Sequence, residues 1–482
     1  MLFNSIDFAI FLPIVFFLYW VVVNKNLQLQ NFLLLVASYV FYGWWDWRFL
    51  SLIAFSTLVD YSLGVLLGKE EKESKRKVYL WTSIIVNLGF LGFFKYYNFF
   101  VESFVDAFTF FGQEIEIGTL NIILPVGISF YTFQTLSYTI DVYKRNLEPT
   151  KNFIAFGAFV SFFPQLVAGP IERASNLLPQ ILNKRSFNYC EAKDGLRLML
   201  WGLFKKVVIA DSLSPIVNDI FSNYSTLSSP VLIMGAIFFA FQIYGDFSGY
   251  SDIAIGTAKL FGIELMSNFK FPYFSKNIGE FWRRWHISLS TWFRDYLYIP
   301  LGGSRGSKMV GIRNVFAIFL VSGFWHGANW TFIFWGLFHA LLFLPSFLIG
   351  TNRKYAEVKN TRLNVLAMIS NVYRTLLTFI LVTIGWVFFR SETITDSFIY
   401  LKRIGSSFSG IPYIHPNGYR LVDYIVLLVF FIVYEYIIRN NERKPIGFKN
   451  RYVRLFVYVL LVFLMLLFYD DGVDRSFIYF QF

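Results

Sequence analysis

The sequence predicts an all-α polytopic membrane protein. Of its 482 residues, 56% are hydrophobic and 15% are charged, whereas a soluble domain carries about 25% charged residues. The mean hydropathy is +0.52. Many separate apolar runs approach or exceed the roughly 20 residues that a helix needs to cross a bilayer. Basic residues gather in the short loops between these runs, as they do in the loops of membrane proteins.

The net charge of +12 indicates membrane topology and contact with anionic lipid, and it does not indicate nucleic-acid binding. The basic run Lys69–Lys77 must lie in water, and the positive-inside rule places it in the cytoplasm. Lys205 and Lys206 interrupt an apolar run, so we expect their amines to snorkel to the membrane surface.

The lengths of the apolar runs predict about eleven crossings, with one or two re-entrant or interfacial segments. The first run, Ile6–Val23, lacks a basic n-region and a small-residue cleavage site, so we expect it to be retained as a span. Trp44, Trp45 and Trp47 follow the second run and are typical of an interfacial belt. We predict one membrane-embedded domain, residues 1–482, with N-terminal spans in 1–117, a core in 118–350 and C-terminal spans in 351–482.

Two apolar stretches of the core contain polar side chains. Leu120–Tyr143 includes Gln134 together with helix-breaking residues, and such segments occur where they are buried in protein or line a cavity. Asp246 and Asp252 lie beside apolar runs, where carboxylates usually face the protein interior or a wet cavity. An interfacial loop, in which an aspartate costs little, is the alternative reading for the two aspartates.

Three of the chain's four histidines lie in the segment Phe281–Ala340. Histidine titrates near neutrality and can take or give a proton at working pH. We therefore predict the reactive centre here, with His286 and His326 as its members. His339 falls roughly on the opposite side of the helix that follows His326, so we expect it to be a packing residue.

The segment Trp282–Tyr296 has the spacing of one amphipathic helix at 3.6 residues per turn. His286 falls on its aromatic face, whereas Arg283 and Arg294 share a flank that suits a phosphate-bearing ligand. A surface anchor with a packed histidine fits the same wheel equally well. The aromatic face consists of Trp282, Trp285, Leu289, Trp292, Phe293 and Tyr296.

His326 lies between Gly323 and Gly327, with Trp325 and Trp330 close by in the sequence. Small neighbours allow close approach of a second helix or of substrate. An ionisable residue within an apolar helix is a functional candidate by default, the alternative being a satisfied packing histidine.

The single cysteine and the absence of several known motifs limit the kinds of functional site that the chain can contain. The single Cys190 excludes an internal disulfide, and the absence of HExxH or a tight His/Asp cluster argues against a metal site. No GxSxG elbow or phosphate-cradling glycine loop is present. What fits is a buried general base for acyl transfer, because an acceptor hydroxyl must lose its proton as it attacks a thioester carbonyl.

Several long motifs closely resemble the signatures of the membrane-bound O-acyltransferase family, nearest to its branch of alginate O-acetylation membrane subunits. The resemblance spans most of the chain. His326 matches the family's essential histidine, and His286 matches its second, less uniform polar position. The motifs are SFYTFQTLSYTIDVY (129–143), LVAGPIER (166–173), YGDFSGYSDIAIG (244–256), FWRRWHISLSTWFRDYLYIPLGG (281–303) and GFWHGANWTFIFWG (323–336).

This resemblance implies a ring of helices around a central tunnel in a bacterial inner membrane. An acyl donor, expected to be acetyl-CoA with no bound cofactor, would enter from the cytoplasm. The acetyl group would pass to a separate extracytoplasmic SGNH-type acetyltransferase that modifies a polysaccharide. The expected catalytic residues are His326 and His286. The residues expected to line the substrate path are Trp325, Asn329, Arg294, Asp246, Asp252 and Gln134.

Two alternatives stay open. Within the family, the same motifs serve D-alanyl transfer to teichoic acid or O-acetylation of peptidoglycan. From a different class, a proton-coupled transporter or flippase would use the histidines with Asp246 and Asp252 as a proton relay. Transporters of that kind often contain inverted repeats, and the sequence shows no clear repeat.

Overall fold

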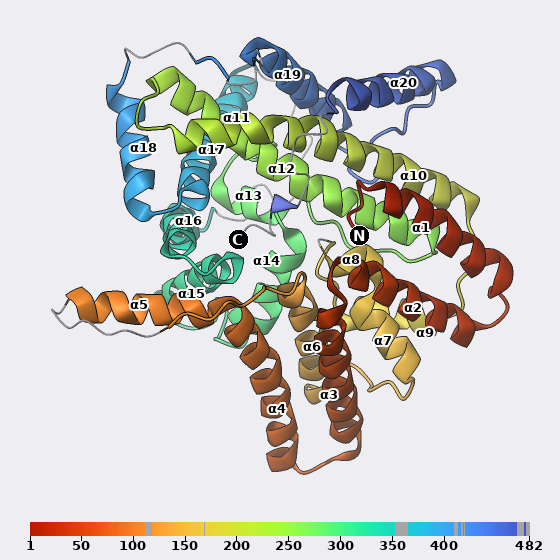
Figure 1. Cartoon of the computed structure of the whole chain (residues 1–482). Helices are drawn as coiled ribbons and strands as arrows, with labels where there is room; N and C mark the ends of the chain where they lie inside the picture. Colours follow the sequence, from red (N-terminus) through yellow and green to blue (C-terminus); the bar gives the residue numbers. More distant parts are fainter. Residues whose placement is uncertain are drawn as a thin grey trace. The chain divides into compact units, whose positions relative to one another are not determined.

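The structure, a computed structural model, describes residues 1–110, 118–167, 169–351, 365–408, 413–415, 418, 420–469 and 477–478. Every regular element within these ranges is a helix, which confirms the predicted all-α fold (Figure 1). The helices form two compact units. The first contains Met1–Leu196 and Ala254–Met266, and the second contains Arg197–Ile253 and Ser267–Phe482. The predicted single domain of three consecutive stretches stays a prediction.

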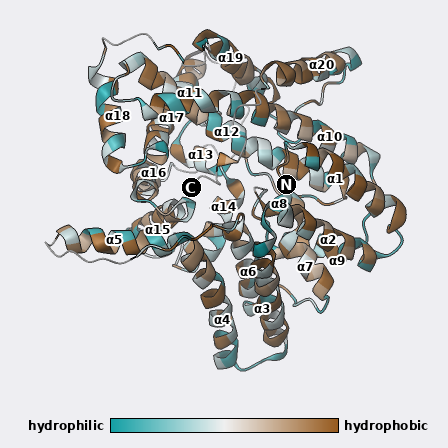
Figure 2. Ribbon diagram, in the orientation of Figure 1, coloured by the Kyte–Doolittle hydropathy of each residue, from teal (hydrophilic) through white to brown (hydrophobic). Residues whose placement is uncertain are grey.

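Seven helical stretches of the described chain are long and apolar enough to cross a membrane. Hydrophobic residues run along most of the helices (Figure 2). This confirms a multi-pass membrane protein, while the count of about eleven crossings stays a prediction. The seven stretches are Leu27–Lys69, Glu73–Phe110, Ser229–Leu260, Lys308–His326, Trp330–Leu348, Leu366–Arg390 and Leu421–Ile438.

The first unit is built from the N-terminal helices. Helices α10 (Tyr189–Phe204) and α12 (Ser229–Leu260) continue from one unit into the other. The other elements of the first unit are α1 (Ile6–Phe17), η1 (Leu18–Val22), α2 (Leu27–Asp46), η2 (Trp47–Phe49), α3 (Leu50–Lys69), α4 (Glu73–Leu91), η3 (Gly92–Tyr96), α5 (Tyr97–Phe110), α6 (Ile128–Tyr143), α7 (Phe153–Ser161), α8 (Phe163–Leu166) and α9 (Ala174–Leu182).

Helices α3, α4 and α6 pack side by side (Figure 1), and a buried carboxylate lies between them. Asp60 of α3 is fully buried. Its Oδ1 accepts hydrogen bonds from Ser83 Oγ at 2.5 Å and Thr139 Oγ1 at 2.9 Å, and its Oδ2 accepts one from Asn87 Nδ2 at 2.8 Å. Hydrogen bonds between helices stabilise packing where lipid offers no polar partner. Asp60 therefore joins the three helices.

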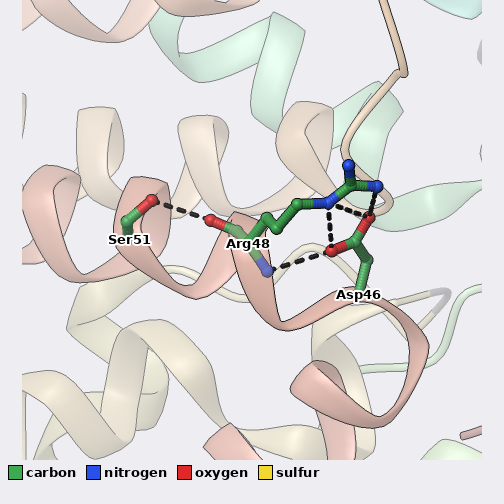
Figure 3. Close-up of polar contacts among 3 residues, drawn as sticks. All are labelled: Asp46, Arg48 and Ser51. Carbon is green, nitrogen blue, oxygen red and sulfur yellow. Dashed lines mark hydrogen bonds and ion pairs between the residues drawn. The ribbon is translucent and has the colours of Figure 1, made fainter.

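A short exposed turn joins α2 to α3. The Asp46 carboxylate accepts the Arg48 backbone N–H at 3.0 Å and also binds the Arg48 guanidinium (Figure 3). The Ser51 hydroxyl donates to the Arg48 carbonyl at 2.8 Å. Trp44 and Trp47, beside this turn, are 58% and 74% exposed. The interfacial belt of Trp44, Trp45 and Trp47 stays a prediction.

The second unit contains the segment with the three histidines, and α15 (Lys308–His326) and α16 (Trp330–Leu348) form a tight helical hairpin in it (Figure 1). A Cβ added at Gly323 would lie 2.2 Å from the Phe332 carbonyl oxygen, and one added at Gly336 would lie 2.3 Å from the Phe319 carbonyl oxygen. The glycines therefore admit the backbone of the partner helix. The other elements are η4 (Lys205–Asp211), α11 (Ser212–Ser222), η5 (Pro272–Phe274), α13 (Ile278–Arg284), α14 (Ile287–Phe293), η6 (Arg294–Tyr298), α17 (Val365–Arg390), α18 (Ile394–Ser406), α19 (Leu421–Ile438) and α20 (Arg451–Leu467).

This backbone contact predicts that Gly336→Ala destabilises the hairpin. The new methyl group would overlap a backbone oxygen that cannot move independently, and overpacking of this kind lowers the free energy of unfolding by about 1–3 kcal/mol. Thermal melting of the detergent-solubilised protein measures the effect. Gly405→Ala in α18 is the control, because nothing lies within 4 Å of its Cβ position and alanine favours a helix by roughly 0.5–1 kcal/mol. Equal melting temperatures for Gly336→Ala and the parent would contradict the close approach.

Candidate functional site

The predicted continuous helix over Trp282–Tyr296 is wrong, because the chain breaks at its centre. Helix α13 ends at Arg284 and α14 begins at Ile287. Trp285 is extended, with φ −103° and ψ 128°, and His286 is left-handed, with φ 42° and ψ 55°. The left-handed region costs an L-residue roughly 1–2 kcal/mol, and residues held in it often mark functional sites. A helical wheel assumes one uniform turn and cannot show this break.

The break directs the His286 ring into the protein. The side chain is 1% exposed, and its ring centroid lies 4.6 Å from that of Phe247 in α12. The centroid of His326, the last residue of α15, lies 6.2 Å from that of His286. The structure therefore brings the two predicted catalytic histidines together from two elements that are separate in sequence.

Aromatic rings enclose His326, which is 2% exposed. Its ring centroid lies 5.0 Å from that of Trp325, 5.1 Å from that of Trp335 and 5.5 Å from that of Phe389. The indole of Trp330 is instead 55% exposed. The contact between Trp335 and His326 was not predicted from the sequence. It arises because the hairpin folds α16 back along α15 and sets Trp335 against His326.

The two histidines suit different tasks. Neither ring nitrogen of His286 has a hydrogen-bond partner among the residues that the structure describes. Burial lowers the pKa of His286 to about 3, so the ring is uncharged at neutral pH. An efficient general base has a pKa near the working pH, and a ring with so low a pKa suits hydrogen bonding better than proton uptake. His286 therefore suits hydrogen bonding to a bound hydroxyl or carbonyl, and the assignment of His326 as the base stays a prediction.

His339 is packed among rings, as the sequence predicts. It is fully buried, and its ring centroid lies 5.0 Å from those of Trp282 and Trp335. Trp335 contacts both His326 and His339. Trp335 therefore links the rings packed around His339 to those packed around His326.

The remaining candidates in the second unit lie in different surroundings. Trp325 is 4% exposed and contacts both predicted catalytic histidines, with its ring centroid 5.8 Å from that of His286 and 5.0 Å from that of His326. Asn329 caps α16, because its Oδ1 accepts the Thr331 N–H at 2.9 Å. The Arg294 side chain is 58% exposed and binds the neighbouring Asp295. Of these three candidates, Trp325 is the one whose ring is recorded in contact with His286 and His326 among the described residues.

Gln134 belongs to the first unit. It lies in α6, is 2% exposed, and its Nε2 has no hydrogen-bond partner within the described ranges. Its place on a substrate path stays a prediction. The described residues also contain no group of three or more His, Cys, Asp or Glu side chains arranged to hold a metal ion.

Asp246 and Asp252 lie within α12 and form ion pairs with the π-helical turn η4. Lys206 Nζ lies 2.8 Å from Asp246 Oδ1 and 2.7 Å from Asp211 Oδ1. Lys205 Nζ lies 2.7 Å from Asp252 Oδ2. The two lysines are 3% and 1% exposed, so the expectation that they snorkel is wrong. Each lysine amine pairs with a carboxylate inside the protein, so it does not need to reach the membrane surface.

Glycines of α12 make these ion pairs possible. A Cβ at Gly249 would lie 2.8 Å from the Gly202 carbonyl oxygen, and one at Gly245 would lie 3.1 Å from the Lys205 carbonyl oxygen. The end of α10 and the start of η4 therefore approach α12 more closely than larger residues would permit. Both aspartates face this contact from within a helix, so the interfacial-loop reading does not describe them.

Comparison with known proteins gives one family. The family model described as MBOAT, membrane-bound O-acyltransferase family, matches residues 149–389. This range includes Asp246, Asp252 and the whole segment Phe281–Ala340. The matched region therefore contains both histidines of the site and the buried ion pairs.

Three curated relatives show the range of the similarity. The probable alginate O-acetylase AlgI of Pseudomonas syringae pv. tomato is 43% identical over 82% of this chain and 73% of the relative. The peptidoglycan O-acetyltransferase of Helicobacter pylori is 36% identical over 83% of this chain and 79% of the relative. The teichoic acid D-alanyltransferase of Bacillus subtilis is 28% identical over 50% of this chain and 64% of the relative.

Proposed function

Because the chain belongs to the membrane-bound O-acyltransferase family, we propose that it moves an acetyl group from a cytoplasmic donor for O-acetylation of an extracytoplasmic, alginate-like polysaccharide. The observation that carries the proposal is the pair of buried histidines, whose ring centroids lie 6.2 Å apart inside an aromatic shell. The relatives named alginate O-acetylase, with 43% identity over 82% of the chain, support this acceptor class.

The residues of the site fit acyl transfer from a thioester to a hydroxyl. His326 takes the hydroxyl proton as the oxygen attacks the thioester carbonyl carbon. When the intermediate collapses, the C–S bond breaks, and the proton passes from the imidazolium to the departing thiolate. His286, whose ring nitrogens have no hydrogen-bond partner in the described part of the chain, orients the reacting oxygen. The surrounding rings exclude water, which would otherwise hydrolyse the thioester.

The donor and the partners are part of the same proposal. Acetyl-CoA is the donor and reaches His326 from the cytoplasm through a tunnel in the helical ring, without a bound cofactor. An SGNH-type acetyltransferase on the outer side receives the acetyl group and passes it to the polymer. The protein then resides in a bacterial inner membrane. Peptidoglycan O-acetylation is the second candidate, supported by the relative of that name with 36% identity over 83% of the chain.

A thiol-release assay tests the proposed reaction. The purified protein in liposomes, together with the SGNH-type acetyltransferase, is supplied with acetyl-CoA and with mannuronate oligosaccharides, peptidoglycan fragments or no acceptor, and free CoA thiol is measured. We expect thiol release from acetyl-CoA that is faster with an acceptor, and acetyl esters on that acceptor by mass spectrometry. If thiol is released from a D-alanyl-loaded carrier protein and not from acetyl-CoA, the reaction is D-alanyl transfer and not acetylation. Proton flux without thiol release from any donor would favour the transporter reading.

A further inference from the structure

The backbone at His286 is held in an unfavourable conformation, and the structure shows what holds it. His286 is one of three non-glycine residues with positive φ among those described. Such a conformation persists only where the surroundings impose it. The groups bonded to the residues on either side of His286 therefore determine where its ring points.

One residue, Asn268, makes most of these contacts through its backbone and its side chain. Asn268 is 1% exposed, and its backbone carbonyl accepts the N–H of Ile287 at 2.9 Å. Its Oδ1 accepts the Ser288 hydroxyl at 2.9 Å and the Ser288 backbone N–H at 3.4 Å. Asn268 thus binds the two residues that follow His286 and accepts the first two backbone N–H groups of α14, which have no partner within the helix.

Two further bonds complete the arrangement. Asn268 Nδ2 donates to Ser251 Oγ of α12 at 3.1 Å, which attaches the turn to the helix whose Phe247 packs on the His286 ring. On the other side of the turn, the Lys270 N–H donates to the Arg284 carbonyl at 3.0 Å. The left-handed residue is therefore held between two backbone hydrogen bonds to the same short segment.

We propose that Asn268 is a positioning residue for acyl transfer, which fixes the His286 ring beside His326 by clamping the turn at residues 285–288 to α12. The expected effect of Asn268 on the reaction rate rests on the proposed function, whereas its expected effect on the turn rests on the geometry alone. Asn268 is suited to the task because an amide both donates and accepts. Here Nδ2 binds Ser251 of α12 and Oδ1 accepts two hydrogen bonds from Ser288, so an aliphatic residue at this position would lose all three.

The kinetic test is a double-mutant cycle between Asn268 and His286. The His286→Asn variant removes the imidazole but keeps a residue type that tolerates a left-handed backbone. We expect Asn268→Ala to lower kcat on the order of 10- to 100-fold, with little change in the KM for acetyl-CoA. In the His286→Asn background we expect Asn268→Ala to cause no further loss of kcat, because its effect passes through His286.

A second measurement separates the clamp from the reaction. Backbone hydrogen–deuterium exchange of peptides covering residues 285–290 is expected to be roughly fivefold faster or more in Asn268→Ala. Ser251→Ala, which removes only the bond to α12, should give a smaller increase. The control is Asn314→Ala, a fully buried asparagine of α15 that bonds the Leu301 and Gly303 carbonyls, and it should leave exchange at 285–290 unchanged.

The outcomes distinguish the two proposals. Unchanged exchange at 285–290 in Asn268→Ala would overturn the clamp whatever the enzyme does. Additive losses of kcat in the double variant would overturn its action through His286. Faster exchange in a parent protein that transfers no acyl group would leave the clamp standing and refute the proposed function.

Discussion

Replacing His326 by alanine is expected to abolish acetylation while the protein still inserts into the membrane. The substitution removes the group that takes the acceptor's proton, and a general base contributes roughly 10²–10⁴-fold to rate. The ring is 2% exposed and enclosed by aromatic side chains, so water cannot readily replace it. The measurement is the acetyl content of the polysaccharide in a strain that expresses the variant at the parent level, together with thiol release by the purified protein.

His339→Phe is the matched control for this prediction. His339 is also a buried histidine of the same segment, and a phenyl ring fills a similar space among Trp282 and Trp335. We expect this variant to retain acetylation, because the packing role needs no proton transfer. Normal polysaccharide acetylation in a well-expressed His326→Ala strain would contradict the proposed role of His326 as the general base. Loss of activity in His339→Phe with normal folding would show that His339 is more than a packing residue.

Lys206→Met is expected to give the largest loss of stability. Lys206 Nζ lies 2.7 and 2.8 Å from two carboxylates, those of Asp211 and Asp246, and removing the lysine leaves both acids buried without this cation. Removing one partner of a buried ion pair destabilises a protein by about 3–5 kcal/mol. We expect little folded protein to accumulate, and a much lower melting temperature for what is recovered in detergent.

An exposed ion pair is the control for Lys206→Met. Arg48 binds Asp46 at the surface, with 59% of the arginine side chain exposed (Figure 3). Because solvent screens an exposed pair, Arg48→Met should change the melting temperature far less. A second variant, Lys206→Arg, keeps the charge and should recover part of the stability. Equal stability of Lys206→Met and Arg48→Met would mean that burial contributes nothing to the Lys206 pairs.

Part of the candidate site was predictable because the relevant signals are local. An imidazole in an apolar segment is unusual wherever the chain folds, so His286 and His326 were identified from their own neighbourhood. The glycines around His326 also marked a place where a second helix can approach closely, and Gly323 does contact the backbone of its partner helix.

The contacts that place these residues were not predictable by the same reasoning. Asn268 determines the turn at His286 through bonds to Ser251 and Ser288, and no periodicity of the sequence links these positions. Lys206 was expected to reach for the membrane surface, because nothing in its own run shows that Asp246 of another helix lies within 2.8 Å. Trp335 was missed because a wheel describes one helix and not the hairpin that sets α16 against His326.

The sequence by itself determined that this is a helical, multi-pass membrane protein of the membrane-bound O-acyltransferase family, with two candidate histidines. Composition and motifs carry that information, since the need to bury apolar residues and satisfy backbone groups within each span acts locally. Only the tertiary structure decided that the helix breaks at His286, that its ring lies 6.2 Å from that of His326, and that Asp246 and Asp252 are paired. Those features depend on hydrogen bonds, ion pairs and close backbone contacts between residues far apart in the chain, and they exist only once the helices have packed.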